Sequence, residues 1–471
     1  MTIDDIRDTL TNRMATHRID LERLVGIPSV SAPGFDPAAV RRSAEEVAEL
    51  LSARGLESVA LLEVDGAHPA VYGDWLHAGD DAPTVLCYAH HDVQPPGDEA
   101  QWKSPPFEAT ERDGRLFGRG AADDKAGILV HVAAIDAWLT ARGTLPVNVK
   151  VLVEGEEETG SEHLAAFLDA HGSRLAADVV VLTDSVNWKV GVPALTYQQR
   201  GLVDARFEVR AAAHALHSGM YGGVVPDPVG AVAQVLASLT GPGGEVAIPG
   251  FADDARPPTE DERSRLEALD FDEGGFREEA GLLADVPLAG DPGRHPLERI
   301  WMAPSVTVIG VDAPTVAGSS NTIQPRAGAR VSVRLAPGQD PVRARDLLCS
   351  HIERSVPWGL ESTVTPGAAA RPYVADPAHP STAAALRALS DAYGRPAVLT
   401  GIGGTIPFIE PFVAAFSRDG DPLPALLTGV EDPDTRAHGT NESLHLDDWH
   451  RACLGQAYLL AELARAREVE R

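Results

Sequence analysis

The chain has 471 residues, and its 69 acidic against 40 basic side chains give a formal net charge of −29. This charge disfavours nucleic acid and anionic membranes as partners, because both would repel it. A composition of 44% hydrophobic and 23% charged residues is typical of a globular protein. Its length suggests roughly two to three domains. The three cysteines are far apart and form no CxxC pair, so we expect no disulfide framework and a cytoplasmic location.

Apolar residues recur at helical spacing near the N-terminus, at Ile3, Ile6, Leu10 and Met14, and predict an amphipathic helix. Acidic residues come early in this segment, and it lacks the apolar core of a signal peptide. No later stretch approaches the roughly 18 apolar residues of a membrane span, so we expect no membrane association.

Three short apolar runs, Thr84–Ala89, Val147–Val153 and Val179–Thr183, predict buried parallel strands. Helical patterns lie between them, at Lys125–Leu139 and Glu162–Ala170. This alternation predicts an α/β fold with a mostly parallel sheet and helices on both faces. In such folds ligands bind at the carboxyl ends of the strands.

The pattern changes after about residue 200. Val203–Arg210 and Ala329–Leu335 alternate apolar and polar residues, as half-exposed antiparallel strands do. We therefore expect a smaller α+β domain over residues 204–375, inserted into a catalytic domain made of residues 1–203 and 376–471.

Chemically active side chains follow each predicted strand. His90 and Asp92 follow the first, a run of acids that includes Glu157 and Glu158 follows the second, and Asp184 follows the third. Asp123 opens a predicted helix. So many carboxylates at one sheet edge would repel one another, and bound divalent cations are the simple resolution.

The spacing of these residues suggests which of them bind metal, which orient a ligand and which act as a base. In an extended segment Asp92 lies on the same side as His90 and can orient the imidazole of a metal ligand. One of two adjacent glutamates can bind metal while the other acts on water as a general base.

Each residue also has a structural alternative: a solvated pair for His90 and Asp92, a helix cap for Asp123, an exposed loop for His438, and a solvated acid for Glu156. Taken together, the nitrogen and oxygen donors favour zinc or a similar first-row cation.

As a set, eight segments resemble the co-catalytic zinc metallopeptidases of the carnosinase, glutamate carboxypeptidase and aminoacylase family, in the family's order and over nearly the whole chain. A ninth, Ile248–Arg263, is similar to the branch of cytosolic non-specific dipeptidase and carnosinase. The eight are YAHHDVQP (Tyr88–Pro95), LFGRGAADDKAG (Leu116–Gly127), EGEEETGS (Glu154–Ser161), LTDS (Leu182–Ser185), ALHSGMYGG (Ala215–Gly223), VRLAP (Val333–Pro337), GGTIP (Gly403–Pro407) and AHGTNE (Ala437–Glu442).

The resemblance implies two Zn²⁺ ions per subunit, with Mn²⁺ or Co²⁺ as substitutes. His90 and Asp184 would hold one ion, Glu158 and His438 the other, and Asp123 would bridge both. It further implies that Asp92 supports His90, that Glu157 is the general base, and that the Asp123–Asp124 peptide bond is cis.

The resemblance also implies substrate contacts from the inserted domain, which would serve as a lid and as the interface of a homodimer. His217 would enter the partner subunit's active site and stabilise the oxyanion, and Arg334 would bind the C-terminal carboxylate of a small peptide. Gly404 and Thr405 would supply nearby donors, and Thr322 is a weaker match to a contact across the dimer.

The sequence departs from the family pattern at Ala89, His91 and Asp227-Pro228. His91 could be mistaken for a ligand, although its side chain should point away from that of His90.

The function expected is metal-dependent hydrolysis of dipeptides or short peptides with a free C-terminal carboxylate. The alternatives are an N-acyl amino-acid deacylase or carboxypeptidase on the same scaffold, an acidic metal-buffering protein, and a metal-free glycosidase with paired carboxylates.

Overall fold

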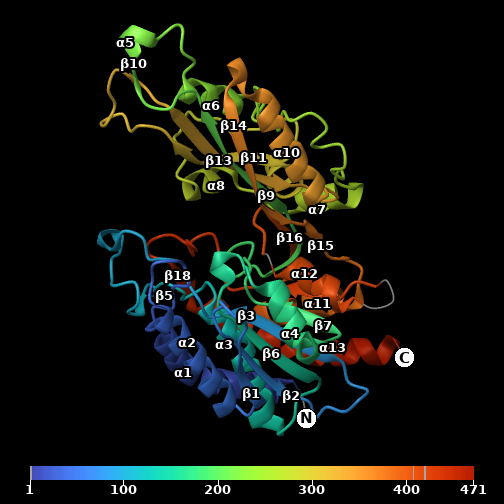
Figure 1. Ribbon diagram of the computed structural model, residues 1–471. Coiled ribbons are helices and arrows are strands. Elements are labelled where there is room, and N and C mark those ends of the chain that lie inside the picture. The colour runs from blue at the N-terminus through green and yellow to red at the C-terminus, as the bar shows by residue number, and fades with distance from the viewer. Residues whose placement is uncertain (1–2, 407, 418–420, 471) are drawn as a thin grey trace. The chain divides into compact units, whose positions relative to one another are not determined.

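The computed structural model describes residues 3–406, 408–417 and 421–470, and they form two compact units (Figure 1). The first unit comprises Met1–Tyr197, Ala375–Thr400 and Ile406–Arg471, and the second comprises Gln198–Val374 and Gly401–Thr405. The second unit thus starts before the predicted boundary at 204. It also takes in Gly401–Thr405, whose backbone and side chains bond to Arg200.

The first unit is built on a sheet whose central strands are parallel, as the sequence predicts. β6, β3, β7 and β17 run parallel, and antiparallel strands flank them. The order is β1 (Glu57–Leu62), β2 (Ala70–Trp75), β6 (Asn148–Glu154), β3 (Thr84–His90), β7 (Val179–Leu182), β17 (Ala425–Leu427), β8 (Ala194–Gln199) and β15 (Tyr373–Val374), and β16 (Val398–Ile402) also pairs with β8.

Helices cover both faces of this sheet, because alternate residues of its strands point to opposite sides. Val85 and Cys87 of β3 point into the large core, whereas Tyr88 stacks on Phe408 with ring centroids 3.9 Å apart, and Phe408 stacks on Phe412. The helices on the core side are α1 (Asp4–Val25), α2 (Pro37–Ala53), α3 (Lys125–Arg142), α11 (Pro380–Tyr393) and α13 (Leu446–Glu470); those on the Tyr88 side are α4 (Leu164–Leu175) and α12 (Ile409–Phe416).

A small antiparallel sheet brings the C-terminal part of the chain beside the segment that leads to Asp123. Its strands are β4 (Thr110–Arg112), β5 (Arg115–Phe117) and β18 (Ser443–His445), with β5 in the middle. Two short 3₁₀ helices, η1 (Glu99–Gln101) and η2 (Glu157–Thr159), complete the first unit.

The second unit is an antiparallel sheet packed on helices. Val203, Ala205 and Phe207 alternate along β9 and face a separate core, which confirms the period-two pattern of this strand. The sheet order is β11 (Ser305–Asp312), β13 (Arg326–Leu335), β9 (Gly201–Arg210) and β14 (Glu361–Ala370); α6 (Pro228–Ala237) and α10 (Pro341–Ser355) cover it, and β10 (Leu216–His217) pairs with β12 (Thr322–Ile323) beside α5 (Ser218–Tyr221).

Residues 241–296 of this unit are rich in Gly, Pro and acidic residues, and they contain helices that this composition does not predict. In α7 (Glu260–Ala268) the Thr259 hydroxyl accepts from the Glu262 N–H and the Glu262 carboxylate accepts from the Thr259 N–H. This capping box is a sequence signal for a helix start. The remaining elements are α8 (Glu273–Glu279), α9 (Pro296–Met302) and η3 (Pro357–Gly359).

Candidate metal centre

The ends of the parallel strands bring histidines and carboxylates together in the first unit. Among the described residues, three groups of side chains could each hold a metal ion, because the ligand atoms within each group lie within 4.8 Å of one another. The groups are His90 with Glu157 and Asp184, Asp123 with Glu158 and His438, and Asp123 with Asp184 and Glu431. All five metal ligands suggested by the sequence are therefore neighbours.

Asp123 lies between the two histidines. Its Oδ1 is 3.1 Å from Nε2 of His90, and its Oδ2 is 3.0 Å from Nε2 of His438. His438 Nε2 is also 3.2 Å from Oε2 of Glu158. The two oxygens of one carboxylate thus face two separate donor sets, an arrangement that suits two cations sharing a bridge. The Asp123–Asp124 bond is cis, which confirms that prediction.

The orientation of the His90 ring suits a metal ligand. Its Nδ1 lies 3.1 Å from the Asp92 carbonyl and 3.4 Å from the Asp92 carboxylate, so we place the ring proton on Nδ1. The fully buried Nε2 then presents a lone pair to Asp123 and to Asp184, whose Oδ2 is 4.0 Å away, and it has no hydrogen-bond partner in the part of the chain that the structure describes. A lone pair facing carboxylate oxygens is repulsive unless a cation lies between them, so this donor set fits a divalent metal.

Asp92 has a second role that the sequence did not indicate. Its carboxylate accepts hydrogen bonds from the backbone N–H groups of Glu157 at 3.3 Å and Glu158 at 3.1 Å, and from the Ser31 hydroxyl at 2.6 Å. One buried carboxylate therefore fixes both the His90 ring and the turn that carries the paired glutamates.

The two glutamates have different surroundings. Glu158 is held by Gln94, whose backbone N–H and side-chain amide donate to its carboxylate at 3.1 and 2.8 Å. Within the described residues, the Glu157 carboxylate makes no hydrogen bond. Burial, together with repulsion from Asp184 and Glu158, raises the pKa of Glu157 well above its usual value. A raised pKa lets a glutamate both take and return a proton near neutral pH.

The charge of the centre is unbalanced without cations. Burial and the nearby charges of Asp123 and Glu158 raise the pKa of Asp184 to about 7. Burial, and then repulsion from the charges of Asp123 and Asp184, also raise the pKa of Glu431 well above its usual value. Glu431 was not among the residues predicted from the sequence, although it lies shortly after the strand β17.

A buried ion pair holds the backbone at Asp123. Glu442 accepts from Arg119 Nη1 at 2.6 Å, from Gly120 and Ala122 N–H at 3.0 Å each, and from Asp123 N–H at 3.1 Å. Arg119 also donates to the Gly439 carbonyl, next to His438. This pair, which the sequence analysis missed, ties the loop of Asp123 to the loop of His438.

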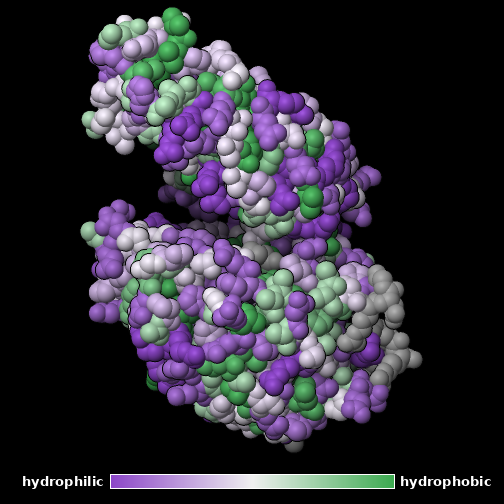
Figure 2. All heavy atoms as spheres, in the orientation of Figure 1, coloured by the Kyte–Doolittle hydropathy of each residue, from purple (hydrophilic) through white to green (hydrophobic). Residues whose placement is uncertain are grey.

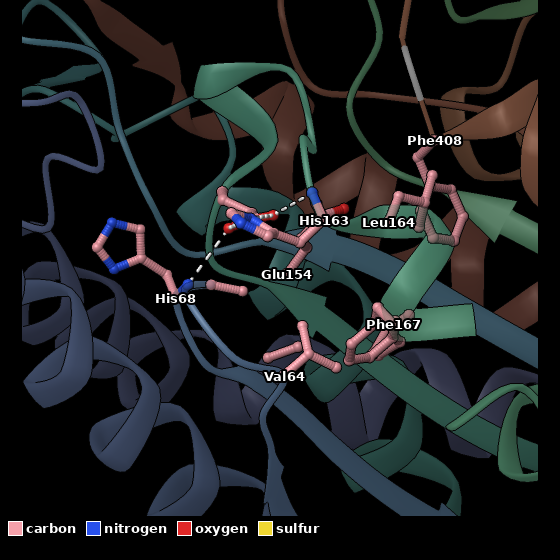
Figure 3. A pocket seen from close by; sticks show the side chains of 11 residues that line it. Val64, His68, Glu154, His163, Leu164, Phe167 and Phe408 are labelled. Carbon is pink, nitrogen blue, oxygen red and sulfur yellow. Dashed lines mark hydrogen bonds and ion pairs between the residues drawn. The ribbon is translucent and has the colours of Figure 1, made fainter. Parts of the chain in front are cut away.

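The prediction for Glu156 was wrong, because this side chain is buried rather than solvated. Glu156 lines a small pocket together with His68 and His163, which are labelled in Figure 3. Its carboxylate accepts from the His68 N–H at 3.2 Å and from the His163 N–H at 3.0 Å. Glu156 therefore shapes the turn before Glu157. His91 points away from the centre, as expected, with Nε2 2.9 Å from the Pro69 carbonyl.

The remaining predicted residues lie in the second unit. His217 pairs with Thr322 across β10 and β12, and its imidazole is exposed. Arg334 donates to the Thr405 hydroxyl at 2.7 Å, and burial lowers the Arg334 pKa. Gly404 is exposed next to Thr405, with open space where a side chain would start. The structure thus forms two pairs within this unit, His217 with Thr322 and Arg334 with Thr405.

Comparison with known proteins identifies similar chains. Residues 86–462 match the model of peptidase family M20/M25/M40. The chain is 32% identical over 382 residues to the cysteinylglycine-S-conjugate dipeptidase of Corynebacterium striatum, covering 81% of each, and 28% identical to the human β-Ala-His dipeptidase, over 77% of this chain and 71% of that one.

Among solved structures, Dug1p of Saccharomyces cerevisiae superposes with a TM-score of 0.86 at 24% identity, over 98% of this chain and 99% of that one, and so shows the same fold. The metallo-carboxypeptidase Sso-CP2 of Sulfolobus solfataricus superposes with a TM-score of 0.83 at 27% identity, over 95% and 99%. In the part of the chain that the structure describes, no helix combines the length and apolar character needed to cross a membrane.

Proposed function

Because the chain belongs to peptidase family M20/M25/M40, we propose that it hydrolyses the amide bond of dipeptides or short peptides that carry a free C-terminal carboxylate. The observation that carries the proposal is the position of Asp123, whose two oxygens face His90 and His438 at 3.1 and 3.0 Å. The relatives named as dipeptidases support the substrate class.

We propose two Zn²⁺ ions as cofactors, with Mn²⁺ or Co²⁺ as substitutes. His90 and Asp184 would hold one ion, Glu158 and His438 the other, and Asp123 both. When bound, the cations lower the pKa of water toward neutrality and polarise the amide carbonyl.

Glu157 is the residue best placed to move protons. Its carboxylate has no hydrogen bond within the described residues, and it lies in one group with His90 and Asp184. It would take a proton as water attacks the amide carbon and return it to the departing amine. Asp92 contacts His90 and accepts from the N–H groups of Glu157 and Glu158. It would thereby fix the position of the base relative to the proposed ligands.

The second unit would bind the rest of the substrate. Arg334 can meet a carboxylate with a bidentate fork, and the Thr405 hydroxyl and the Gly404 backbone lie beside it. We propose that His217, with Thr322 beside it, acts in the partner subunit of a homodimer and stabilises the oxyanion, a type of contact worth about 3–4 kcal/mol.

Two exposed apolar surfaces of the second unit support dimerisation. Figure 2 shows hydrophobic side chains gathered near α5, where Met220, Tyr221 and Val224 are exposed. The terminal strand of the four-stranded sheet, β11, exposes Val308 and Ile309. As for the compartment, we propose the cytoplasm, because Cys87, Cys349 and Cys453 are all free.

The test is to replace Glu157 by Gln and to measure both turnover and metal content. We expect turnover of Ala-Ala-type dipeptides to fall by at least about a hundredfold, with both metals retained. The control is Glu45→Gln, which removes an equal charge from the exposed surface of α2. If metal content fell in parallel with activity, Glu157 would be a ligand and the proposed division of the pair would be wrong.

Substrate class and dimer contact have their own tests. Assays beside dipeptides separate the alternatives: N-acetyl amino acids test for a deacylase, and longer peptides test for a carboxypeptidase. The carboxypeptidase alternative is included because of the likeness to Sso-CP2. Mixing inactive His217→Ala with inactive Glu157→Gln should restore part of the activity, since one cleft of each mixed dimer has both residues. Mixed dimers without activity would show that His217 does not act across the interface.

A further inference from the structure

We propose that Glu431 is a ligand of the cation on the His90 side and that its carboxylate shifts this position toward manganese relative to zinc. The inference rests on the proposed function, which supplies a centre with two divalent cations. It adds a ligand that lies outside the set of five suggested by the sequence.

The first observation is the placement of Glu431. One of its carboxylate oxygens lies within 4.8 Å of oxygens of both Asp123 and Asp184. The side chain is only partly exposed, and within the described residues it makes no hydrogen bond or ion pair. Three carboxylates therefore converge, and among the described residues imidazole nitrogens lie within 4.0 Å of Asp123 and Asp184 but form no ion pair with Glu431.

The backbone makes this convergence a fixed feature of the sheet. β7 and β17 are parallel neighbours, and beyond their ends the Val186 and Glu431 segments form an isolated parallel bridge. The Asn187 N–H donates to the Glu431 carbonyl at 2.8 Å. Asp184 and Glu431 thus emerge from adjacent strands at one edge.

A second, independent observation points to a cation at this place. His90 is fully buried, and among the described residues its Nε2 has no hydrogen-bond partner, although it lies 3.1 Å from Asp123 Oδ1 and 4.0 Å from Asp184 Oδ2. With the proton on Nδ1, this nitrogen can only donate a lone pair. Asp184 belongs both to the group of His90 and to the group of Glu431, so we place the cation where these two groups meet.

The two cation positions then differ in chemistry. In this proposal the ligands on the His90 side are Asp123, Asp184, Glu431 and one imidazole, whereas those on the His438 side are Asp123, Glu158 and one imidazole. Carboxylate oxygen suits manganese, and imidazole suits zinc. Glu431 is the residue that makes the first position richer in oxygen.

The test is equilibrium dialysis of the full chain against Mn²⁺ alone and against Zn²⁺ alone, with bound metal measured directly. Wild type and the Glu45→Gln control should each bind two ions per chain. In Glu431→Gln, affinity for Mn²⁺ at one position should fall by about 10- to 100-fold, the size of effect seen when groups around a metal are removed, and affinity for Zn²⁺ should fall less. Glu431→Asp, which keeps a carboxylate, should bind Mn²⁺ more tightly than Glu431→Gln.

Equal Mn²⁺ affinities in wild type and Glu431→Gln would overturn the inference while leaving the proposed function intact. Equal Mn²⁺ affinities in Glu431→Gln and Glu431→Asp would overturn it too, because the carboxylate that Asp retains would then contribute nothing to Mn²⁺ binding. If the wild-type chain bound neither metal, the proposed function itself would fail.

Discussion

Replacing Glu442 by Gln should destabilise the first unit strongly. The carboxylate is fully buried and accepts four hydrogen bonds, from Arg119 and from the backbone N–H groups of Gly120, Ala122 and Asp123. A glutamine offers one acceptor oxygen, so its amide would face two N–H donors, and the buried Arg119 would lose its counter-charge. Removing one partner of a buried ion pair costs about 3–5 kcal/mol of unfolding free energy.

The assay is urea unfolding of the metal-free chain, so that loss of bound metal does not contribute. The matched control is Glu63→Gln, because Glu63 pairs with Arg41 at 2.5 Å while both side chains are about half exposed. An exposed pair of this kind is worth at most about 1 kcal/mol. If Glu442→Gln stayed within about 1 kcal/mol of wild type, Glu442 would not hold the Asp123 loop as described.

Two further predictions concern the core behind the metal centre. Gly127→Ala should destabilise the chain by about 1–3 kcal/mol in the same assay, because a Cβ there would lie 1.9 Å from Asp124 Oδ1 and 2.5 Å from Thr183 Oγ1; an unchanged midpoint would contradict this packing. Burial lowers the pKa of His131 to about 4, so below about pH 6.5 the unfolded chain binds a proton that the folded chain does not. Stability should therefore fall between pH 6.5 and 4, and His131→Gln should show a shallower fall.

The sequence predicts the core of the site because of a simple geometric rule. Parallel strands end at one edge, so the residues that follow Thr84–Ala89, Val147–Val153 and Val179–Thr183 must meet there, and His90, Glu157 and Asp184 do. The same rule, applied to the short strand β17, leads to Glu431 at the same edge.

Other features depend on contacts that no local pattern reveals. Glu156 follows β6 like its neighbours, yet its side chain turns to His68 and His163 instead of solvent. Glu442 and Arg119 are more than three hundred residues apart in the sequence, and the pairing of β5 with β18 in the small sheet brings them together. Spacing arguments cannot predict such pairs, because their partners come from separate loops.

These buried polar contacts explain how a carboxylate-rich centre can be rigid. Several groups of the candidate centre are fixed by neighbouring residues: His90 and the turn of the paired glutamates by Asp92, Glu158 by Gln94, and Asp123 by Glu442. Asp92 and Glu442 accept from backbone N–H groups, and Gln94 donates to the Glu158 carboxylate, so the carboxylate oxygens of the centre are held close together. Repulsion among those oxygens then cannot be relieved by moving the side chains apart, and bound cations become the way to relieve it.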